Sequence, residues 1–301
     1  MKKLRLALDW TVNTNHSGFV VAKEKGFYAA EQLEVQISTP AEDNYSLTPM
    51  KKLELGQTEL ALCPMESILS YRTKSIPFLT KAIGTVFQQD LSAVVTLDRP
   101  DVKSPRDLDG LRYASYKAKY EDMIIQEMVK NDGGKGEIEL LYPEKLGIWE
   151  TLLSKKADAT WIFSNWEGVE AQMKGHVLKS FRLGDFGIPY GYSPVIATSE
   201  EHLLDRKEDL RKFMEASRQG FLFAQKFPEE TARILIDFVT AKDQDLWFLT
   251  QSQNFTNPYY GEASDLGKMD PANVDAFLAW LYEKGLETRR FSSEEVIENL
   301  L

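Results

Sequence analysis

The chain has few cysteines and histidines, and this scarcity excludes several kinds of site. Its 301 residues contain one cysteine, Cys63, and three widely separated histidines, His16, His176 and His202. A single cysteine can form neither an internal disulfide nor a thiolate zinc site, and the histidines lack the spacing of metal ligands. We therefore expect no metal ion.

Short motifs of several large enzyme classes are also missing. The sequence contains no G-x-S-x-G, no Walker A motif and no G-x-G-x-x-G. Their absence removes the usual hydrolases, P-loop enzymes and dinucleotide-binding oxidoreductases, although it does not exclude enzymes in general.

Basic side chains are fewer than acidic ones, 36 against 46, which gives a formal net charge of −10. Nucleic acids are bound by basic faces, so we expect no nucleic-acid partner. No window approaches the roughly 18 uninterrupted apolar residues of a membrane span, so we expect no membrane insertion. A hydrophobic content of 43% is typical of globular proteins, and the length suggests two domains.

The first ten residues, MKKLRLALDW, leave the localisation open. Two lysines resemble the start of a secretory leader, but Arg5 and Asp9 interrupt any apolar stretch. The protein is expected in the cytoplasm, or in the periplasm or at the cell surface if a leader has been removed.

Strand and helix patterns alternate with short loops through the first two thirds of the chain. Alternating leucines predict a strand over about 4–9, and a helix follows over about 16–25. The alternation begins again with KSPRDLDG at 103–110, and from about residue 203 almost every segment is helical, including SSEEVIENLL at 292–301. This order predicts an α/β protein with two units, each a mainly parallel sheet covered by helices.

Polar and aromatic side chains follow the first predicted strand. Asp9 and Trp10 end this strand, and Asn13, Asn15 and His16 begin the helix after it. In open parallel sheets, ligands bind beyond the carboxyl ends of the strands, where helix N-termini direct their N–H groups. Because no flexible linker separates the two units, we expect them to touch and to hold a ligand in a cleft between them.

The opening stretch resembles the bacterial substrate-binding proteins for thiamine-pyrimidine precursors and the yeast-type pyrimidine synthase of the same fold. The similarity covers most of the chain up to about residue 200. It is carried by LDW at 8–10, NTNH at 13–16, AKEKGFY at 22–28, LELGQTELAL at 53–62, KSPRDLDGLRYASY at 103–116 and WIFSNWEGVE at 161–170.

The resemblance implies a two-lobed type II periplasmic-binding-protein fold with a helical C-terminal region. One lobe is expected to contain residues 1–92 and 196–301, and the inserted lobe residues 93–195. The expected ligand is a thiamine-precursor aminopyrimidine of the hydroxymethyl or formylaminomethyl type. The expected protein partner is the permease of an ABC importer.

The resemblance also suggests roles for individual residues. Trp10 is expected to stack on the ligand ring, and Glu167 to pair with its exocyclic amine and protonated ring nitrogen. The simpler interpretations are a core tryptophan and a carboxylate favoured by a helix dipole. Asn13, Asn15 and His16 either cap the first helix or contact the ring substituent.

Three tyrosines, Tyr116, Tyr190 and Tyr192, lie near the expected cleft loops. Tyr190 or Tyr192, which flank Gly191, is expected to form the opposite aromatic wall, although packing alone explains each tyrosine individually. Tyr45 is interpreted as a core or surface hydrophobe.

The sequence differs from the synthase at the positions of that enzyme's catalytic residues. Alignment places Cys63 at the position of the lysine that holds pyridoxal phosphate, and Ser67 at that of a histidine. We therefore expect no cofactor, no catalytic residue and a buried, unreactive Cys63. Two alternatives remain: a synthase-like enzyme using Lys117 or Lys119, or a binding module for a sulfonate or flavin-like ligand.

Overall fold

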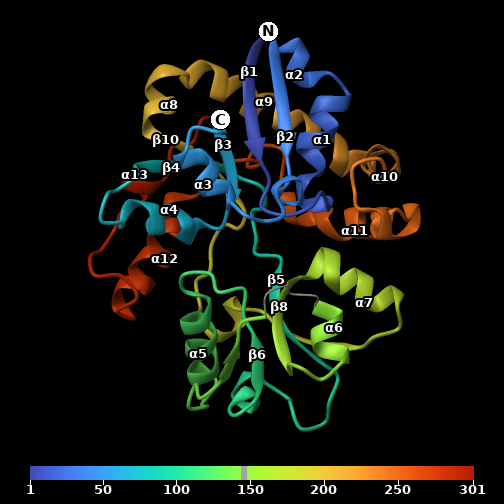
Figure 1. The fold of residues 1–301 in the computed structure, drawn as a ribbon, viewed down its shortest axis with the longest axis vertical. Coiled ribbons are helices and arrows are strands. Elements are labelled where there is room, and N and C mark those ends of the chain that lie inside the picture. The colour runs from blue at the N-terminus through green and yellow to red at the C-terminus, as the bar shows by residue number, and fades with distance from the viewer. Residues whose placement is uncertain (144–147) are drawn as a thin grey trace. The chain divides into compact units, whose positions relative to one another are not determined.

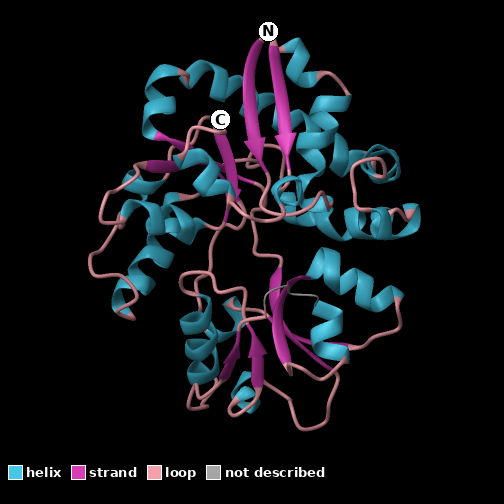
Figure 2. Ribbon diagram, in the orientation of Figure 1, coloured by secondary structure: helices cyan, strands magenta, loops and turns pink. Residues whose placement is uncertain are grey.

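The computed structural model describes residues 1–143 and 148–301, apart from the side chains of 148–150. The chain divides into two compact units: a first unit of residues 1–90, 191–275 and 291–301, and a second unit of residues 91–190 and 276–290. The two units are described separately (Figures 1 and 2).

A five-stranded sheet forms the centre of the first unit, in the order β2-β1-β3-β10-β4. β1 pairs in parallel with β2 and β3, and β10 runs antiparallel to both β3 and β4, so a single strand is reversed. Every residue of the central β3 is buried, as a strand covered on both faces requires. The strands are β1 (Lys2–Ala7), β2 (Leu33–Ser38), β3 (Leu60–Cys63), β4 (Thr80–Thr85) and β10 (Val195–Ser199).

The helices of the first unit include the C-terminal helical region expected from the sequence. They are α1 (Ser17–Glu24), α2 (Phe27–Ala30), α3 (Pro49–Glu54), α4 (Met65–Arg72), α8 (Glu200–Asp205), α9 (Lys207–Lys226), α10 (Pro228–Leu235), α11 (Leu246–Thr256) and α13 (Ser293–Val296), with the single turns η1 (Thr14–His16), η2 (Pro40–Asp43), η6 (Ala241–Asp243) and η7 (Asn257–Tyr260). α12 (Pro271–Glu283) begins in this unit and ends in the second.

Aromatic packing between α1, α2 and α9 forms much of the first unit's core. The ring of Phe213 on α9 stacks on Tyr28 at a centroid distance of 5.4 Å and on Phe19 at 6.0 Å. Phe221, two turns further along α9, meets Phe19 edge-on at 5.0 Å. Offset and edge-on arrangements of this kind are the favoured geometries of buried aromatic pairs.

The second unit repeats the arrangement of the first. Its sheet has the order β7-β6-β8-β5-β9, with β6 parallel to β7 and β8, and with β5 antiparallel to β8 and β9. Its elements are β5 (Ser92–Leu97), η3 (Pro105–Leu108), β6 (Arg112–Ala114), α5 (Glu121–Asn131), β7 (Glu139–Leu141), α6 (Ile148–Leu153), β8 (Ala159–Phe163), η4 (Ser164–Gly168), α7 (Val169–Met173), β9 (Leu178–Phe181) and η5 (Gly184–Phe186).

Two C-terminal segments differ from the expectation. The helix predicted over 292–301 is wrong beyond Val296, because Ile297 forms a parallel bridge with Ala82 and the next amide donates to the Ala82 carbonyl at 2.8 Å. Residues 276–290, expected in the first lobe, belong to the second unit, where the ring of Phe277 packs edge-on against Tyr190.

Two ion pairs join the segment 276–290 to α5 and to the loop before α5. Lys284 pairs with Glu127 at 2.7 Å, and Glu287 with Lys119 at 2.6 Å. Contacts between residues so far apart in the chain leave no trace in local periodicity, so the sequence could not assign this segment.

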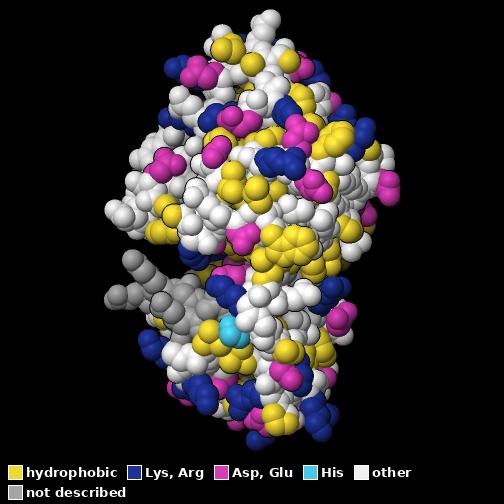
Figure 3. Space-filling view, turned by 90° about the vertical axis from the view of Figure 1, so that its right-hand side faces the viewer, with side chains coloured by type: hydrophobic (Ala, Val, Ile, Leu, Met, Phe, Trp, Pro, Cys, Tyr) yellow, Lys and Arg dark blue, Asp and Glu magenta, His cyan; other side chains and the backbone are white. Residues whose placement is uncertain are grey.

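No helix in the described part of the chain is both long and apolar enough to cross a membrane. On the face shown in Figure 3, basic and acidic side chains are interspersed rather than collected by sign. This face therefore does not show the concentrated positive charge that attracts nucleic-acid phosphates.

Asp158, directly before β8, is expected to stabilise the second unit at neutral pH and to contribute progressively less as the pH falls below about 4. Partial burial alone would raise the pKa of this carboxyl, but hydrogen bonds from Arg112 and Arg99 outweigh that effect and lower it. A depressed folded-state pKa adds stability above the unfolded value of about 3.9, and this contribution is lost as the pH falls through the folded value. Asp158→Asn should therefore lower the free energy of unfolding by roughly 1–2 kcal/mol at pH 7.

Chemical denaturation of the wild type and Asp158→Asn at pH 7 and pH 3 checks this expectation, and the difference should shrink at pH 3. Asp101→Asn is the matched control, because Asp101 also pairs with Arg99 but is exposed, so its loss should change stability little. An equal difference at both pH values would contradict the expected linkage.

Candidate functional site

Asn13, Asn15 and His16 lie in a tight turn at the beginning of α1. The side chain of Asn13 accepts a hydrogen bond from the Asn15 amide at 2.8 Å and so caps η1. All three side chains are buried, with His16 fully inaccessible to solvent. The structure therefore gives Asn13 the capping role that is common for asparagine at helix starts.

Both ring nitrogens of His16 are bound within the chain. Nδ1 accepts from the Asn13 amide at 3.1 Å, and Nε2 lies 2.8 Å from the Asp9 carboxylate. Because Nδ1 accepts, we assign the proton to Nε2, which donates to Asp9. His16 thus joins the end of β1 to the turn at Asn13 and stiffens the segment that carries Trp10.

A buried polar network fixes the same turn from the opposite side. The Thr14 hydroxyl lies 2.7 Å from the Ser252 hydroxyl of α11, and the Tyr260 hydroxyl donates to the Thr14 carbonyl at 3.0 Å. Thr256 adds a third hydroxyl, which donates to Thr14 at 3.3 Å. Satisfied networks of this kind rigidify the backbone that they bind.

Trp10 follows this strand end and is not a core residue, because 38% of its side chain is exposed. Its ring lies beside that of Tyr45, with centroids 5.5 Å apart and planes inclined at 55°. An exposed indole with part of its surface free is suited to stacking on a planar ligand. Tyr45 is the neighbour that sequence reasoning did not single out.

Glu167 lies in the second unit, in the single π-helical turn η4 that follows β8. Its Oε2 accepts a hydrogen bond from the Phe163 amide at 3.0 Å, and the side chain is half-buried. Short π-helical segments occur frequently at functional sites. The turn holds the carboxylate at the carboxyl end of a central strand, where ligands of α/β sheets bind.

Tyr116 is the predicted tyrosine that lies within electrostatic range of Glu167. Its side chain is 41% exposed, yet the pKa of the phenol is raised, first by desolvation of the hydroxyl and then by the negative charges of Glu167 and Glu121. Tyr116 follows β6 and Glu167 follows β8. Because these two strands are parallel, both residues lie at the same edge of the sheet.

Glu121 holds the loop that carries Tyr116. The carboxylate accepts from the Tyr116 amide at 3.0 Å, from the Ala118 amide at 3.2 Å and from the Tyr113 hydroxyl at 2.8 Å. Burial is the largest influence on the pKa of Glu121 and raises it, while these hydrogen bonds act in the opposite direction. The only sequence signal for this role is an acidic residue at a helix start, which is too common to single it out.

The other two predicted tyrosines belong to different units. Tyr192, in the first unit, is buried, and its hydroxyl accepts from the Asp270 amide at 2.9 Å, a packing role. Tyr190, in the second unit, contacts Trp161 at 5.2 Å as well as Phe277, and so forms part of an aromatic cluster.

Cys63 is a buried thiol at the end of β3. Burial raises its pKa well above the usual value, and the nearby charges of Glu66 and Asp9 raise it further. A neutral thiol is a weak nucleophile and a weak metal ligand. Among the described residues, no group of three or more His, Cys, Asp or Glu side chains is arranged to hold a metal ion.

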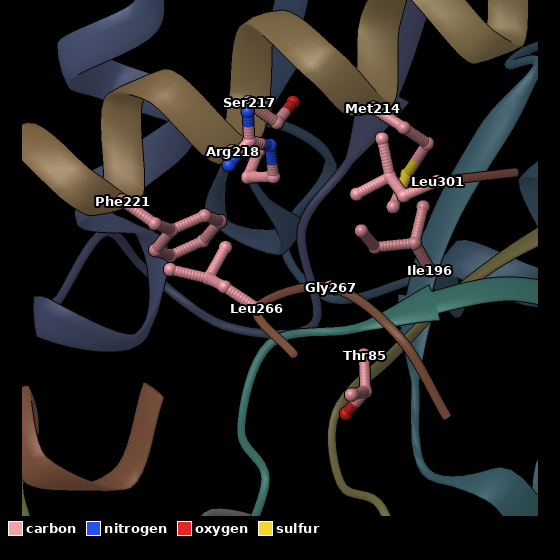
Figure 4. Close-up of a pocket in the computed structure, with 9 residues that line it drawn as sticks. All are labelled: Thr85, Ile196, Met214, Ser217, Arg218, Phe221, Leu266, Gly267 and Leu301. Atoms are coloured by element: carbon pink, nitrogen blue, oxygen red, sulfur yellow. The ribbon is translucent and has the colours of Figure 1, made fainter. Parts of the chain in front are cut away.

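One small cavity lies inside the first unit, below α9 (Figure 4). Its lining includes Met214, Phe221, Ile196 and Leu301, and its volume is about 10 Å³. That is about the space of one water molecule, so a pyrimidine ring cannot enter it. This cavity is a packing void, and none of the candidate site residues lines it.

Two mixed sheets of the same strand order, each with one reversed strand, define an α/β protein of the periplasmic-binding-protein fold. The alkanesulfonate-binding protein of Xanthomonas axonopodis pv. citri matches 99% of this chain and 99% of its own, with a TM-score of 0.73 and 12% identity. A Candida albicans protein described as having the generic periplasmic binding protein fold matches with a TM-score of 0.69 and 14% identity, over 100% of this chain and 98% of its own.

Residues 13–231 match the family described as NMT1/THI5 like, and the chain belongs to this family. One relative, the formylaminopyrimidine-binding protein of Halalkalibacterium halodurans, is 27% identical over 78% of this chain and 70% of its own. Another, the 4-amino-5-hydroxymethyl-2-methylpyrimidine phosphate synthase of Legionella pneumophila, is 22% identical over 77% of this chain and 72% of its own.

Proposed function

We propose that the protein binds a thiamine-precursor aminopyrimidine of the hydroxymethyl or formylaminomethyl type, does not transform it, and delivers it to the permease of an ABC importer. The observation that carries the proposal is the half-buried Glu167 carboxylate, held by the Phe163 amide at the carboxyl end of β8. The similarity to a formylaminopyrimidine-binding protein supports the same ligand class.

Glu167 has the chemistry that an aminopyrimidine edge requires. The exocyclic amine is a donor, and the adjacent ring nitrogen becomes a second donor when protonated. A carboxylate can accept from both in a bidentate, charge-assisted contact, which is stronger than a pair of neutral hydrogen bonds. Tyr116, on the same unit, adds an aromatic side chain close to this carboxylate.

Trp10 of the first unit supplies the apolar contribution. Its partly exposed indole can stack on the heteroaromatic ring, and the network around Asn13 and His16 keeps its segment rigid. A rigid aromatic surface loses little conformational entropy when a ligand binds, so more of the contact energy appears as affinity.

Binding without chemistry is favoured by the groups at the synthase-like positions. The Cys63 thiol is buried and its pKa is raised, so it is poorly suited to act as a nucleophile. Of the two alternative lysines, Lys119 is ion-paired with Glu287 at 2.6 Å and Lys117 lies over the Tyr142 ring at 5.4 Å. Each lysine would have to leave its present contact before its amine could form a Schiff base.

Titration calorimetry of the wild type with 4-amino-5-hydroxymethyl-2-methylpyrimidine and its formylaminomethyl analogue tests the proposal. Saturable binding with one site per chain is expected, with uracil and an alkanesulfonate as negative controls. Uracil is planar but lacks the amino group that Glu167 would bind. Binding of the sulfonate and not of the aminopyrimidines would overturn the proposed ligand class.

A second arm separates binding from catalysis. The protein mixed with pyridoxal phosphate is expected to show no Schiff-base absorbance and no lysine adduct after borohydride reduction. An adduct at Lys117 or Lys119, located by mass spectrometry, would contradict the non-catalytic assignment and favour a synthase-like enzyme.

A further inference from the structure

Tyr45 has an unusual backbone conformation for an aromatic residue. Its φ is 60°, and φ of the preceding Asn44 is 55°, so two consecutive non-glycine residues lie in the left-handed region. Asparagine tolerates this region, but a tyrosine there brings its β-carbon too close to the backbone. Conformations of this kind cluster at ligand-binding sites, where the surrounding structure enforces them.

Several contacts enforce the turn at Tyr45. The Tyr45 amide donates to the Pro40 carbonyl at 2.8 Å. The Asp43 carboxylate accepts from the Ser46 amide at 3.2 Å and pairs with Lys52 of α3 at 2.9 Å. The backbone turn at Tyr45 is therefore held by residues on both sides of it.

This turn places Tyr45 next to Trp10. Trp10 follows β1 and Tyr45 follows β2. The two strands pair in parallel, with Ala7 opposite Ser38, so they end at the same edge of the sheet. Half of the Tyr45 side chain is exposed, although its ring lies only 5.5 Å from that of Trp10. The two inclined rings form an exposed aromatic corner within the first unit.

The Tyr45 hydroxyl is also available for binding. No hydrogen-bond partner for it is present among the described residues, whereas the Tyr192 hydroxyl is bound to the Asp270 amide. Of the three side chains first considered for a ligand substituent, Asn13, Asn15 and His16, those of Asn13 and His16 already bond within the turn. An unengaged phenol at an aromatic corner combines a stacking surface with a hydrogen-bonding group.

We propose that Tyr45 is a second ligand-binding aromatic residue, which packs against the planar ring beside Trp10 and hydrogen-bonds to the polar ring substituent. This inference rests on the proposed function and names a specificity-determining residue for it. The strained turn is then explained as preorganisation, because a ring already held in place loses little freedom on binding.

Tyr45→Asn separates a binding role from a structural one. Asparagine accepts the left-handed conformation, so the melting temperature should stay equal or rise, while the affinity for 4-amino-5-hydroxymethyl-2-methylpyrimidine should fall about tenfold. Calorimetry and thermal unfolding of each variant measure the two effects. Tyr282→Asn, at another exposed tyrosine, is the affinity control and should bind as the wild type does.

Tyr45→Phe tests the hydroxyl. It should weaken binding of the hydroxymethyl ligand about threefold to tenfold and leave binding of 4-amino-2,5-dimethylpyrimidine, which lacks the hydroxyl, unchanged. Equal affinity of Tyr45→Asn and wild type, or an equal effect of Tyr45→Phe on both ligands, would overturn the inference. A wild type that binds no aminopyrimidine overturns the proposed function itself, so the two failures are distinguishable.

Discussion

Glu167→Gln is expected to weaken aminopyrimidine binding by roughly 30-fold or more, because losing one partner of a desolvated, hydrogen-bonded charge pair costs about 2–5 kcal/mol. Glutamine keeps the shape of the side chain, and its carbonyl oxygen can still accept from the Phe163 amide, so η4 should persist. It loses the negative charge, however, and its amide nitrogen would place a donor against a donor of the ligand. Titration calorimetry of variant and wild type at pH 7 measures the effect.

Glu170→Gln is the matched control for this substitution. Glu170 is only three residues further along and pairs with Lys174 on the same helix, an i,i+4 contact at the surface. Its replacement should leave the affinity within about twofold, because such pairs contribute little. If Glu167→Gln bound the ligand as tightly as Glu170→Gln, the carboxylate could not be the group that recognises the amino edge.

Gly220→Val is expected to lower the free energy of unfolding by about 3 kcal/mol, the upper part of the range for overpacked cores. Gly220 on α9 faces Gly18 on α1, and a β-carbon added to Gly220 would lie 1.9 Å from the Gly18 carbonyl oxygen. Backbone cannot rotate away as a flexible side chain can, so the helices must separate. Denaturant unfolding monitored by circular dichroism gives the change.

Separation of α1 from α9 in Gly220→Val should also disturb the turn that holds Asn13 and His16, because α1 begins directly after this turn. Gly184→Ala provides a control, since a β-carbon there meets no atom within 4 Å and the backbone needs no positive φ. Its stability should match that of the wild type. A Gly220→Val protein that is as stable as Gly184→Ala would show that α1 and α9 do not require the glycine contact.

Much of the fold could be predicted from local patterns. Alternating leucines predicted β1, and the short loops between strand and helix patterns predicted mainly parallel sheets. These patterns arise from residues that are neighbours in the sequence, so they can be recognised without knowing the tertiary structure. The strand β4, which was not predicted, and the extended end after Val296 depend instead on partners far along the chain.

The candidate site was less accessible to sequence reasoning. Trp10 and Glu167 could be named because they follow strand ends within the segments that carry the family resemblance. Tyr45 lies outside those segments, and nothing in its neighbours marks it as exposed beside Trp10. Its position follows from two left-handed residues and the Asp43–Lys52 pair, and these features exist only in the folded chain.

Composition and pattern by themselves determined that the protein is an α/β chain of two units, poor in metal ligands and acidic overall. Only the tertiary structure decided that both His16 nitrogens are bound within the chain, that Tyr192 is packed, and that residues 276–290 join the second unit. The physical reason is that burial periodicity is a property of each local segment. Hydrogen bonds and ring contacts between distant segments depend on where the whole backbone places their atoms.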